Sequence, residues 1–230
     1  MNVLLFGATG MVGQGALREC LLADDVTRVQ TIGRTATGQQ HPKLRELVHR
    51  DLFDYSDIEA DLTNFDACFF CIGVTSSGVT EADYTRLTHD LTLAAAQTLT
   101  RLNPQMTFVY VSGAGADSTE TSKTMWARVR GRTENALQRL PFKAVVVFRP
   151  GIIQPLHGIR SKTGSYRWFY TLAWPLLPLL RRLLPNTVLS TQVVGRSMLA
   201  VARRGAREPD QIRAVLEAAD ISAMGRGVAV

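Results

Sequence analysis

The chain has 230 residues, of which 46% are hydrophobic and 20% are charged, and its formal net charge is +6. This length and composition fit one globular domain with a substantial core, or one domain with an appended lobe. The positive residues are scattered and form no basic tail or aromatic-interleaved patch, so we expect no nucleic-acid partner. A moderately basic surface also suits anionic cofactors and substrates.

Cysteine and histidine usage limits the chemistry further. Three cysteines do not make a disulfide framework, and the chain begins directly with a strand pattern, so we predict a cytoplasmic protein without a signal peptide. Cys68 and Cys71 have redox-like spacing, but residues three apart on a strand point to opposite faces, which makes them core residues. The four histidines lack metal-ligand spacing, and we predict no metal site.

The first glycine-rich turn is the strongest local pattern. An apolar strand over residues 3–6 is followed by Gly7-Ala8-Thr9-Gly10-Met11-Val12-Gly13, and a helical pattern continues to residue 22. In a dinucleotide site the first glycine permits the tight turn, the second leaves room for the pyrophosphate and the third lets the helix pack closely. The helix start would offer unpaired N–H groups to the phosphates. A tight strand-to-helix turn without a ligand is the alternative.

The next two strands carry candidate contacts to the adenosine. A strand over 26–32 ends at Gly33-Arg34, whereas an NAD-specific site places an acid near this point. An arginine there can pair with a 2′-phosphate, so we predict NADP(H) in preference to NAD(H). A solvated arginine at a strand end is the alternative. After a short strand over 47–50, Asp51-Leu52 either contacts the adenine or caps the next turn.

Strands and helices continue to alternate as far as residue 150. Strands are expected over 66–72, 106–111 and 143–148, with helices over 80–102 and 123–140. Apolar strands that alternate with helices predict an α/β fold with a doubly wound parallel (Rossmann) sheet, which binds ligands at the carboxyl ends of its strands. Those ends fall at Gly7, Gly33, Asp51, Gly73, Ser112 and Pro150.

We therefore assign residues 1–150 to a dinucleotide-binding core and 151–230 to a small C-terminal helical lobe within the same domain. The stretch 166–184 is apolar, contains prolines and is flanked by basic residues, but its apolar part is too short to span a bilayer. We expect a lid that places Tyr166 and Trp168 in the substrate pocket. Contact with a protein, docking on an anionic membrane and plain core packing are alternatives. A helix over 191–204, a strand over 212–216 and a helical turn over 219–224 follow.

Six short segments carry a family resemblance: 4–10, 33–34, 51–52, 71–75, 111–114 and 149–151. Together they resemble the short-chain dehydrogenase/reductase superfamily in its atypical branch, similar to Tat-interacting-protein-like and NmrA-like proteins that bind NAD(P). The resemblance covers essentially the whole chain. It implies a set of cofactor-binding residues: Gly7, Thr9, Gly10, Met11, Val12, Gly13, Arg34, Asp51, Leu52, Cys71, Ile72, Gly73, Arg130 and Pro150. It also implies a substrate pocket that includes Thr75, Ser112 and Trp126.

The chain departs from this family at the position of the catalytic tyrosine. In the family, a serine after the fifth strand assists a tyrosine acid/base, and a lysine lies four residues beyond the tyrosine. Ser112 matches the serine, but Trp126 occupies the tyrosine position and Arg130 the lysine position. An indole does not titrate usefully, whereas arginine can still hold ribose hydroxyls. We expect cofactor binding to survive and carbonyl reduction to be slow, because general acid catalysis is worth about 10²–10⁴-fold.

Two functional interpretations follow, with a weaker third. The first is an oxidoreductase whose acid is Ser112, a water or the substrate itself. The second is a sensor or scaffold that binds cofactor without turnover and has no small-molecule substrate. A nucleotide-sugar epimerase or dehydratase is weaker, because 151–230 is short for a sugar-nucleotide pocket. Tyr110 lies two residues before Ser112 on the same strand, and we expect it to pack in the core.

Overall fold

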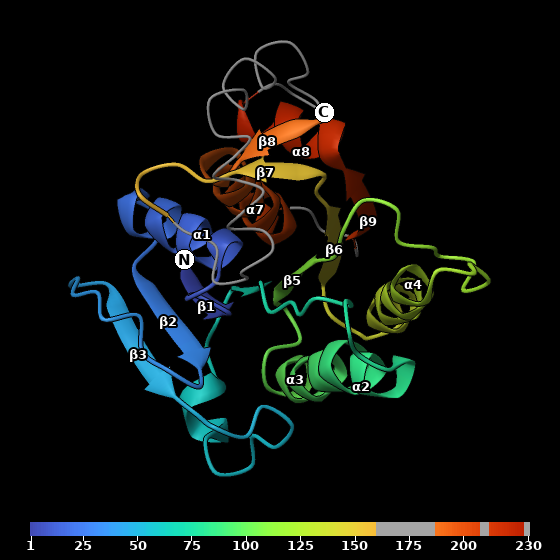
Figure 1. The fold of residues 1–230 in the computed structure, drawn as a ribbon. Helices are drawn as coiled ribbons and strands as arrows, with labels where there is room; N and C mark the ends of the chain where they lie inside the picture. The colour runs from blue at the N-terminus through green and yellow to red at the C-terminus, as the bar shows by residue number, and fades with distance from the viewer. Residues whose placement is uncertain (160–186, 208–211, 228–230) are drawn as a thin grey trace.

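The computed structural model describes residues 1–159, 187–207 and 212–227, and it confirms the doubly wound α/β fold (Figure 1). The central sheet has seven parallel strands in the order β3-β2-β1-β4-β5-β6-β9. These strands are β1 (Asn2–Phe6), β2 (Arg28–Gly33), β3 (Leu44–Val48), β4 (Ala67–Phe70), β5 (Thr107–Val111), β6 (Ala144–Arg149) and β9 (Ile212–Glu217). The order reverses between β1 and β4, which is where a doubly wound sheet binds its ligand.

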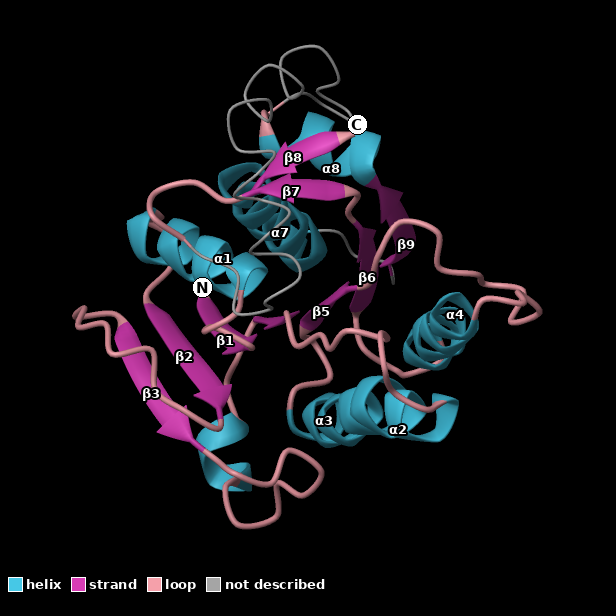
Figure 2. Ribbon diagram, viewed as in Figure 1, coloured by secondary structure: helices cyan, strands magenta, loops and turns pink. Residues whose placement is uncertain are grey.

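Helices cover both faces of this sheet (Figure 2). One layer contains α1 (Met11–Leu22), α7 (Thr191–Arg207) and α8 (Ala218–Gly225); the other contains α2 (Glu81–Thr85), α3 (Leu91–Leu102) and α4 (Met125–Gln138). A short 3-10 turn, η1 (Glu59–Leu62), precedes β4. The alternation of side chains along the strands divides the core accordingly. Val3 and Leu5 pack with the first layer, while Leu4 and Phe6 pack with the second.

The two cysteines near the end of β4 follow the same division. Cys68 belongs to the core beneath α3, whereas Cys71 packs against the core beneath α1 and α7. Burial raises the pKa of the Cys71 thiol to about 12 and that of Cys68 well above its ordinary value. The prediction that these residues are packing residues on opposite faces is therefore confirmed.

Several element boundaries differ from those expected. β3 begins three residues earlier than predicted and ends at Val48, because it is an edge strand whose charged residues hide the apolar pattern. The helix expected over 80–102 is interrupted by a π-helical segment, η2 (Arg86–Asp90), between α2 and α3. Two three-residue strands, β7 (Ile152–Gln154) and β8 (Val188–Ser190), pair with each other in a second sheet. The strand predicted over 212–216 is present as β9, and it joins the main sheet beside β6.

Close backbone packing fixes the turn after β1. Gly7 has a φ of +75°, and a Cβ there would lie 2.7 Å from the backbone of Cys71 at the end of β4. A Cβ at Gly13 would lie 2.1 Å from the carbonyl oxygen of Gly7. The first turn of α1 therefore lies directly against the ends of β1 and β4, and only glycine allows both approaches.

A buried ion pair attaches α4 to the carboxyl end of β6. The Glu134 side chain is 1% exposed and accepts hydrogen bonds from the Arg149 guanidinium, 3.2 Å from Nε to Oε1. Arg149 also contacts Glu217 at the end of β9, at 3.2 Å. The hydrogen bond to Glu134 raises the pKa of Arg149. A Cβ at Gly131 would lie 1.7 Å from the Asp117 carbonyl oxygen, so the helix is also held closely against the loop before it.

We predict that Glu134→Gln lowers the free energy of unfolding by about 3 kcal/mol, because it leaves Arg149 partly buried without its main counter-charge. Urea unfolding followed by circular dichroism measures the change. The matched control is Asp25→Asn, which removes the partner of Arg203 at a site where the two side chains are 49% and 39% exposed. That surface change should cost less than about 1 kcal/mol. Equal losses in the two variants would contradict the prediction.

Candidate functional site

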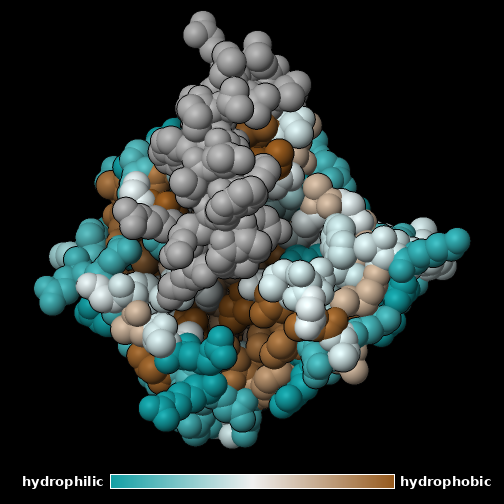
Figure 3. All heavy atoms as spheres, in the orientation of Figure 1, coloured by the Kyte–Doolittle hydropathy of each residue, from teal (hydrophilic) through white to brown (hydrophobic). Residues whose placement is uncertain are grey.

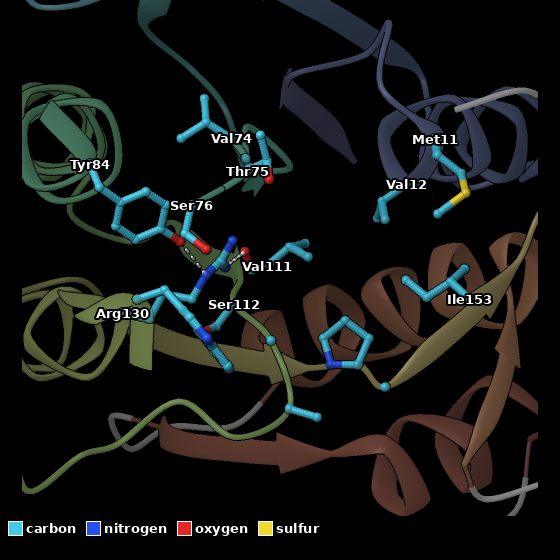
Figure 4. A pocket seen from close by; sticks show the side chains of 16 residues that line it. Met11, Val12, Val74, Thr75, Ser76, Tyr84, Val111, Ser112, Arg130 and Ile153 are labelled. Carbon is cyan, nitrogen blue, oxygen red and sulfur yellow. Dashed lines mark hydrogen bonds between the residues drawn. The ribbon is translucent and has the colours of Figure 1, made fainter. Parts of the chain in front are cut away.

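A cavity of about 540 Å³ opens at the carboxyl ends of β1, β4, β5 and β6. Among the residues predicted for the site, eight line it: Met11, Val12, Gly73, Thr75, Ser112, Trp126, Arg130 and Pro150. On this side of the molecule apolar residues gather near the centre and hydrophilic residues lie around the periphery (Figure 3). The close-up shows Val12, Met11 and Ile153 on one side of the cavity and Tyr84, Ser76, Ser112 and Arg130 on the other (Figure 4). The cavity is thus apolar at the start of α1 and polar beside α2 and α4.

The turn before α1 has the features that a pyrophosphate site requires. The Gly10 amide donates to the Gly7 carbonyl oxygen over 2.9 Å, and the Gln14 side chain donates to the Thr9 carbonyl oxygen over 3.0 Å. Gly10 is the N-cap of α1 and provides no side-chain cap, and the first turn has no acidic residue. The positive end of the helix dipole is therefore open to an anion. The glycine packing at Gly7 and Gly13 is the cradle that a dinucleotide needs, so these residues fit the cofactor.

The residues predicted to contact the adenosine lie just beyond the ends of β2 and β3, outside the lining of the cavity. Arg34 is exposed and makes no hydrogen bond or ion pair with any described residue. The Asp51 side chain accepts from the Phe53 amide at 2.9 Å, as expected for a residue that caps a turn. The Leu52 side chain is buried in the core beneath α3. Any contact of Leu52 with adenine would therefore use its backbone.

Ser112 does not present a free hydroxyl to the cavity. It is 6% exposed, and its hydroxyl donates to Glu134 Oε1 over 2.5 Å. The carboxylate that accepts this proton is the one paired with Arg149. The Ser112 hydroxyl is therefore hydrogen-bonded to the Glu134–Arg149 ion pair, and its proton points at Glu134 rather than into the cavity.

Arg130 is the one charged residue among the described residues that line the cavity. Its Nε donates to the Tyr84 hydroxyl over 3.0 Å, and its Nη1 lies 3.4 Å from the Val111 carbonyl oxygen (Figure 4). Burial lowers the pKa of Arg130, but the neighbouring Tyr110 and Tyr84 hydroxyls outweigh this effect and raise it overall. Trp126 lies one helical turn before Arg130 and lines the same cavity. The two positions predicted to replace the tyrosine and lysine of the family thus line one cavity.

Sequence reasoning missed Tyr84 and Glu134. Neither residue belongs to a local motif, and each joins the site through a contact with a residue distant in sequence. The only signal for Glu134 in the sequence is its spacing of four residues from Arg130 on one helix. Tyr110 is 1% exposed and does not line the cavity, and burial raises its pKa to about 12, so its predicted packing role is confirmed. Tyr166, Trp168 and the predicted lid over 166–184 lie outside the described residues.

Comparisons with known proteins agree with this geometry. The model of the "NAD dependent epimerase/dehydratase family" matches residues 3–130. The chain is 31% identical to "Protein FMP52, mitochondrial" of Saccharomyces cerevisiae over 71% of this chain and 69% of that protein. It is 26% identical to rat "Protein HTATIP2" over 81% of each. It also resembles the Bordetella bronchiseptica enzyme WbmH in complex with NAD+, with a TM-score of 0.65 at 15% identity, over 94% of this chain and 74% of that one.

The names of the fungal relatives contradict our expectation of a cytoplasmic protein. FMP52 of Saccharomyces cerevisiae and the corresponding proteins of two other fungi are named as mitochondrial. The expectation rested partly on the small number of cysteines. That number argues only against a disulfide framework and does not distinguish one reducing compartment from another. In the described residues, no helix combines the length and the apolar character needed to cross a membrane.

The match to the family model spans more than half of the chain, from β1 to Arg130. It includes the glycine-rich turn, the reversal of strand order between β1 and β4, and the first half of α4. The predicted resemblance to atypical short-chain dehydrogenases/reductases is thereby confirmed. The chain therefore belongs to the NAD dependent epimerase/dehydratase family and is an NAD(P)-binding protein of the short-chain dehydrogenase/reductase type.

Proposed function

We propose that the protein is an oxidoreductase that uses NADP(H) in preference to NAD(H) and reduces a small carbonyl compound at a low rate. The observation that carries this proposal is the single cavity that the start of α1 shares with Ser112, Trp126 and Arg130. A bound nicotinamide cofactor supplies a hydride. The protein must hold that cofactor, orient the carbonyl group and deliver a proton to its oxygen.

The residues of the chain divide these tasks along the cavity. The glycine-rich turn and the first amides of α1 would hold the pyrophosphate, and Arg34 would pair with the 2′-phosphate. Arg130 would donate to the hydroxyls of the nicotinamide ribose, because a guanidinium keeps its donors and its charge at neutral pH. Apolar side chains beside the start of α1, including Met11 and Ile153, would limit the access of water to the reacting carbon.

A cofactor-binding sensor without turnover is the second candidate, and the state of two side chains favours it. Trp126 supplies no titratable proton at the position of the family's tyrosine. The Ser112 hydroxyl donates its hydrogen bond to Glu134 rather than to a ligand in the cavity. A protein of this kind would bind NADPH and leave it unoxidised in the presence of carbonyl compounds.

We expect NADPH to bind about ten- to a hundredfold more tightly than NADH, because a charge-assisted bidentate contact from Arg34 to the 2′-phosphate contributes about 1.5–3 kcal/mol. Isothermal titration of both cofactors against the wild type and Arg34→Ala measures the difference, which should vanish in the variant. Arg45→Ala is the matched control, since Arg45 is also exposed but its guanidinium lies on the Pro42 carbonyl oxygen. Equal affinities of the wild type for the two cofactors would reject the assignment.

Trp126→Tyr should raise the rate of NADPH oxidation with para-nitrobenzaldehyde by about tenfold or more, because it places a phenol where the tyrosine of the family protonates its substrate, and general acid catalysis is worth about 10²–10⁴-fold in all. The new phenol would lie one helical turn from Arg130. Combining it with Arg130→Lys restores both residues of the family's pair and tests whether the arginine suffices. Trp126→Phe is the control, since it opens similar space without adding a proton. A similar rise in both single variants would show that space rather than acidity limits the reaction.

A further inference from the structure

We infer that Tyr84 donates the proton in this enzyme and that Arg130 is the cation that supports it. The inference rests on the proposed oxidoreductase function and supplies the step that the missing tyrosine leaves open. Tyr84 comes from α2, and the Tyr-x-x-x-Lys pattern of the family lies on α4. The structure thus brings a phenol to the same cavity from a different helix.

Tyr84 is the one side chain of the described cavity lining that combines a titratable proton with a suitable position. Besides Tyr84, the only ionisable side chain of that lining is Arg130, which remains protonated in proteins. The Ser112 hydroxyl is bound to Glu134, and the Trp126 indole does not titrate usefully. Within the described residues, therefore, a proton for the substrate comes from Tyr84 or from water.

The Tyr84 hydroxyl acts as a hydrogen-bond acceptor in the described structure, so its own proton is available to a substrate. The hydroxyl oxygen accepts from Arg130 Nε over 3.0 Å, and the hydroxyl donates to no described residue. Figure 4 shows the ring directed at the Arg130 guanidinium, with the hydrogen bond between them dashed. A positive charge at hydrogen-bond distance stabilises the negative charge that develops on a phenol oxygen as the proton departs. This is the electrostatic arrangement that a tyrosine and a lysine provide elsewhere in the family.

The position of Tyr84 is fixed by two contacts between α2 and α4. One is its own contact with Arg130, and the other is an ion pair between Glu81 and Arg128, 2.6 Å from Oε2 to Nη2. The side chain is 1% exposed, so packing holds the ring in place. A π-helical segment begins two residues after Tyr84, and such segments are frequent at functional sites. The phenol is consequently a fixed group at the wall of the cavity.

The step balances without another reactant. The carbonyl carbon takes a hydride with its electron pair, and the carbonyl oxygen takes the proton of Tyr84. A C–H bond and an O–H bond form, while the C–H bond of the reduced nicotinamide, the carbonyl π bond and the phenol O–H bond break, so the cofactor is oxidised as the carbonyl compound is reduced. The resulting phenolate beside Arg130 recovers a proton from solvent. Each turnover therefore consumes one reduced cofactor and one solvent proton, and the product is an alcohol.

The experiment compares Tyr84→Phe with Tyr110→Phe in the full-length protein. Tyr110 is equally buried and lies near the same arginine, but it does not line the cavity. We expect Tyr84→Phe to lower NADPH oxidation with para-nitrobenzaldehyde by about tenfold or more, and Tyr110→Phe to leave it unchanged. The dissociation constant for NADPH, measured by titration calorimetry, should stay the same in both. In the Trp126→Tyr background, Tyr84→Phe should cost much less, because a second phenol is then available.

A measurement independent of turnover tests whether Tyr84 meets the ligand. The chain has five tyrosines, and fluorine NMR of protein made with fluorotyrosine resolves them, with Tyr84→Phe and Tyr110→Phe giving the assignments. Addition of NADP+ and para-nitrobenzaldehyde, which cannot react together, should move the Tyr84 resonance and leave that of Tyr110 in place.

The outcomes separate this inference from the proposed function. If the wild type oxidises NADPH and the Tyr84→Phe variant does so at the same rate, the inference alone is overturned. A Tyr84 resonance that does not move in the presence of both ligands overturns it as well. A wild type that binds NADPH but oxidises none with carbonyl probes removes the proposed oxidoreductase function, and the role of Tyr84 as a proton donor falls with it.

Discussion

The contact between the first turn of α1 and the ends of β1 and β4 is the constraint on which the site depends. It requires a backbone with a positive φ at Gly7 and the absence of side chains at Gly7 and Gly13, where a Cβ would collide with neighbouring backbone atoms. Because β1 and β4 are the strands at which the order of the sheet reverses, the helices α1 and α3 that follow them pack on opposite faces of the sheet, and a crevice lies beyond the strand ends. The same packing therefore creates the anion-binding turn and one wall of the cavity.

The opposite wall depends on charges buried beneath α4. Glu134 pairs with Arg149 at the end of β6 and accepts a hydrogen bond from the Ser112 hydroxyl. These two contacts align α4 with the ends of β5 and β6. This arrangement has a chemical consequence. A serine that donates to a buried carboxylate is a poor proton source for a substrate, so the residue that matches the family pattern best by sequence is not the best acid by geometry. The other hydroxyl that lines the cavity beside Arg130, that of Tyr84, comes from α2.

Local patterns were sufficient to predict much of this structure. The glycine-rich turn, the apolar strands and the opposed directions of Cys68 and Cys71 depend on residues close in sequence, and each of these features is present. The pairing of β7 with β8 joins segments far apart in the chain, and each strand has only three residues. No periodicity can be read over so short a run, and these strands were missed for that reason.

The same distinction applies to the site. Ser112, Trp126 and Arg130 were placed in one pocket because a motif on one strand and one helix relates them. Tyr84 is 46 residues from Arg130, and their hydrogen bond exists only because α2 packs beside α4. Glu134 reads as an ordinary helical glutamate until the end of β6 brings Arg149 against it. Contacts of this kind depend on how helices pack on the sheet, and a single sequence does not encode them in any short pattern.

Arginine at position 130 suits this arrangement better than the lysine of the family would. Its planar group directs Nε to the Tyr84 hydroxyl and Nη1 toward the Val111 carbonyl oxygen at the same time. Gly73 lies on the remaining side, where even a Cβ would remain 3.8 Å from Nη2. A lysine ammonium is a single point charge on a flexible stem and cannot hold three fixed directions. The guanidinium can therefore bind the Tyr84 hydroxyl of α2 while keeping a donor turned toward the space expected for the nicotinamide ribose. The predicted replacement of the family's tyrosine by Trp126 thus does not leave Arg130 without a phenol partner.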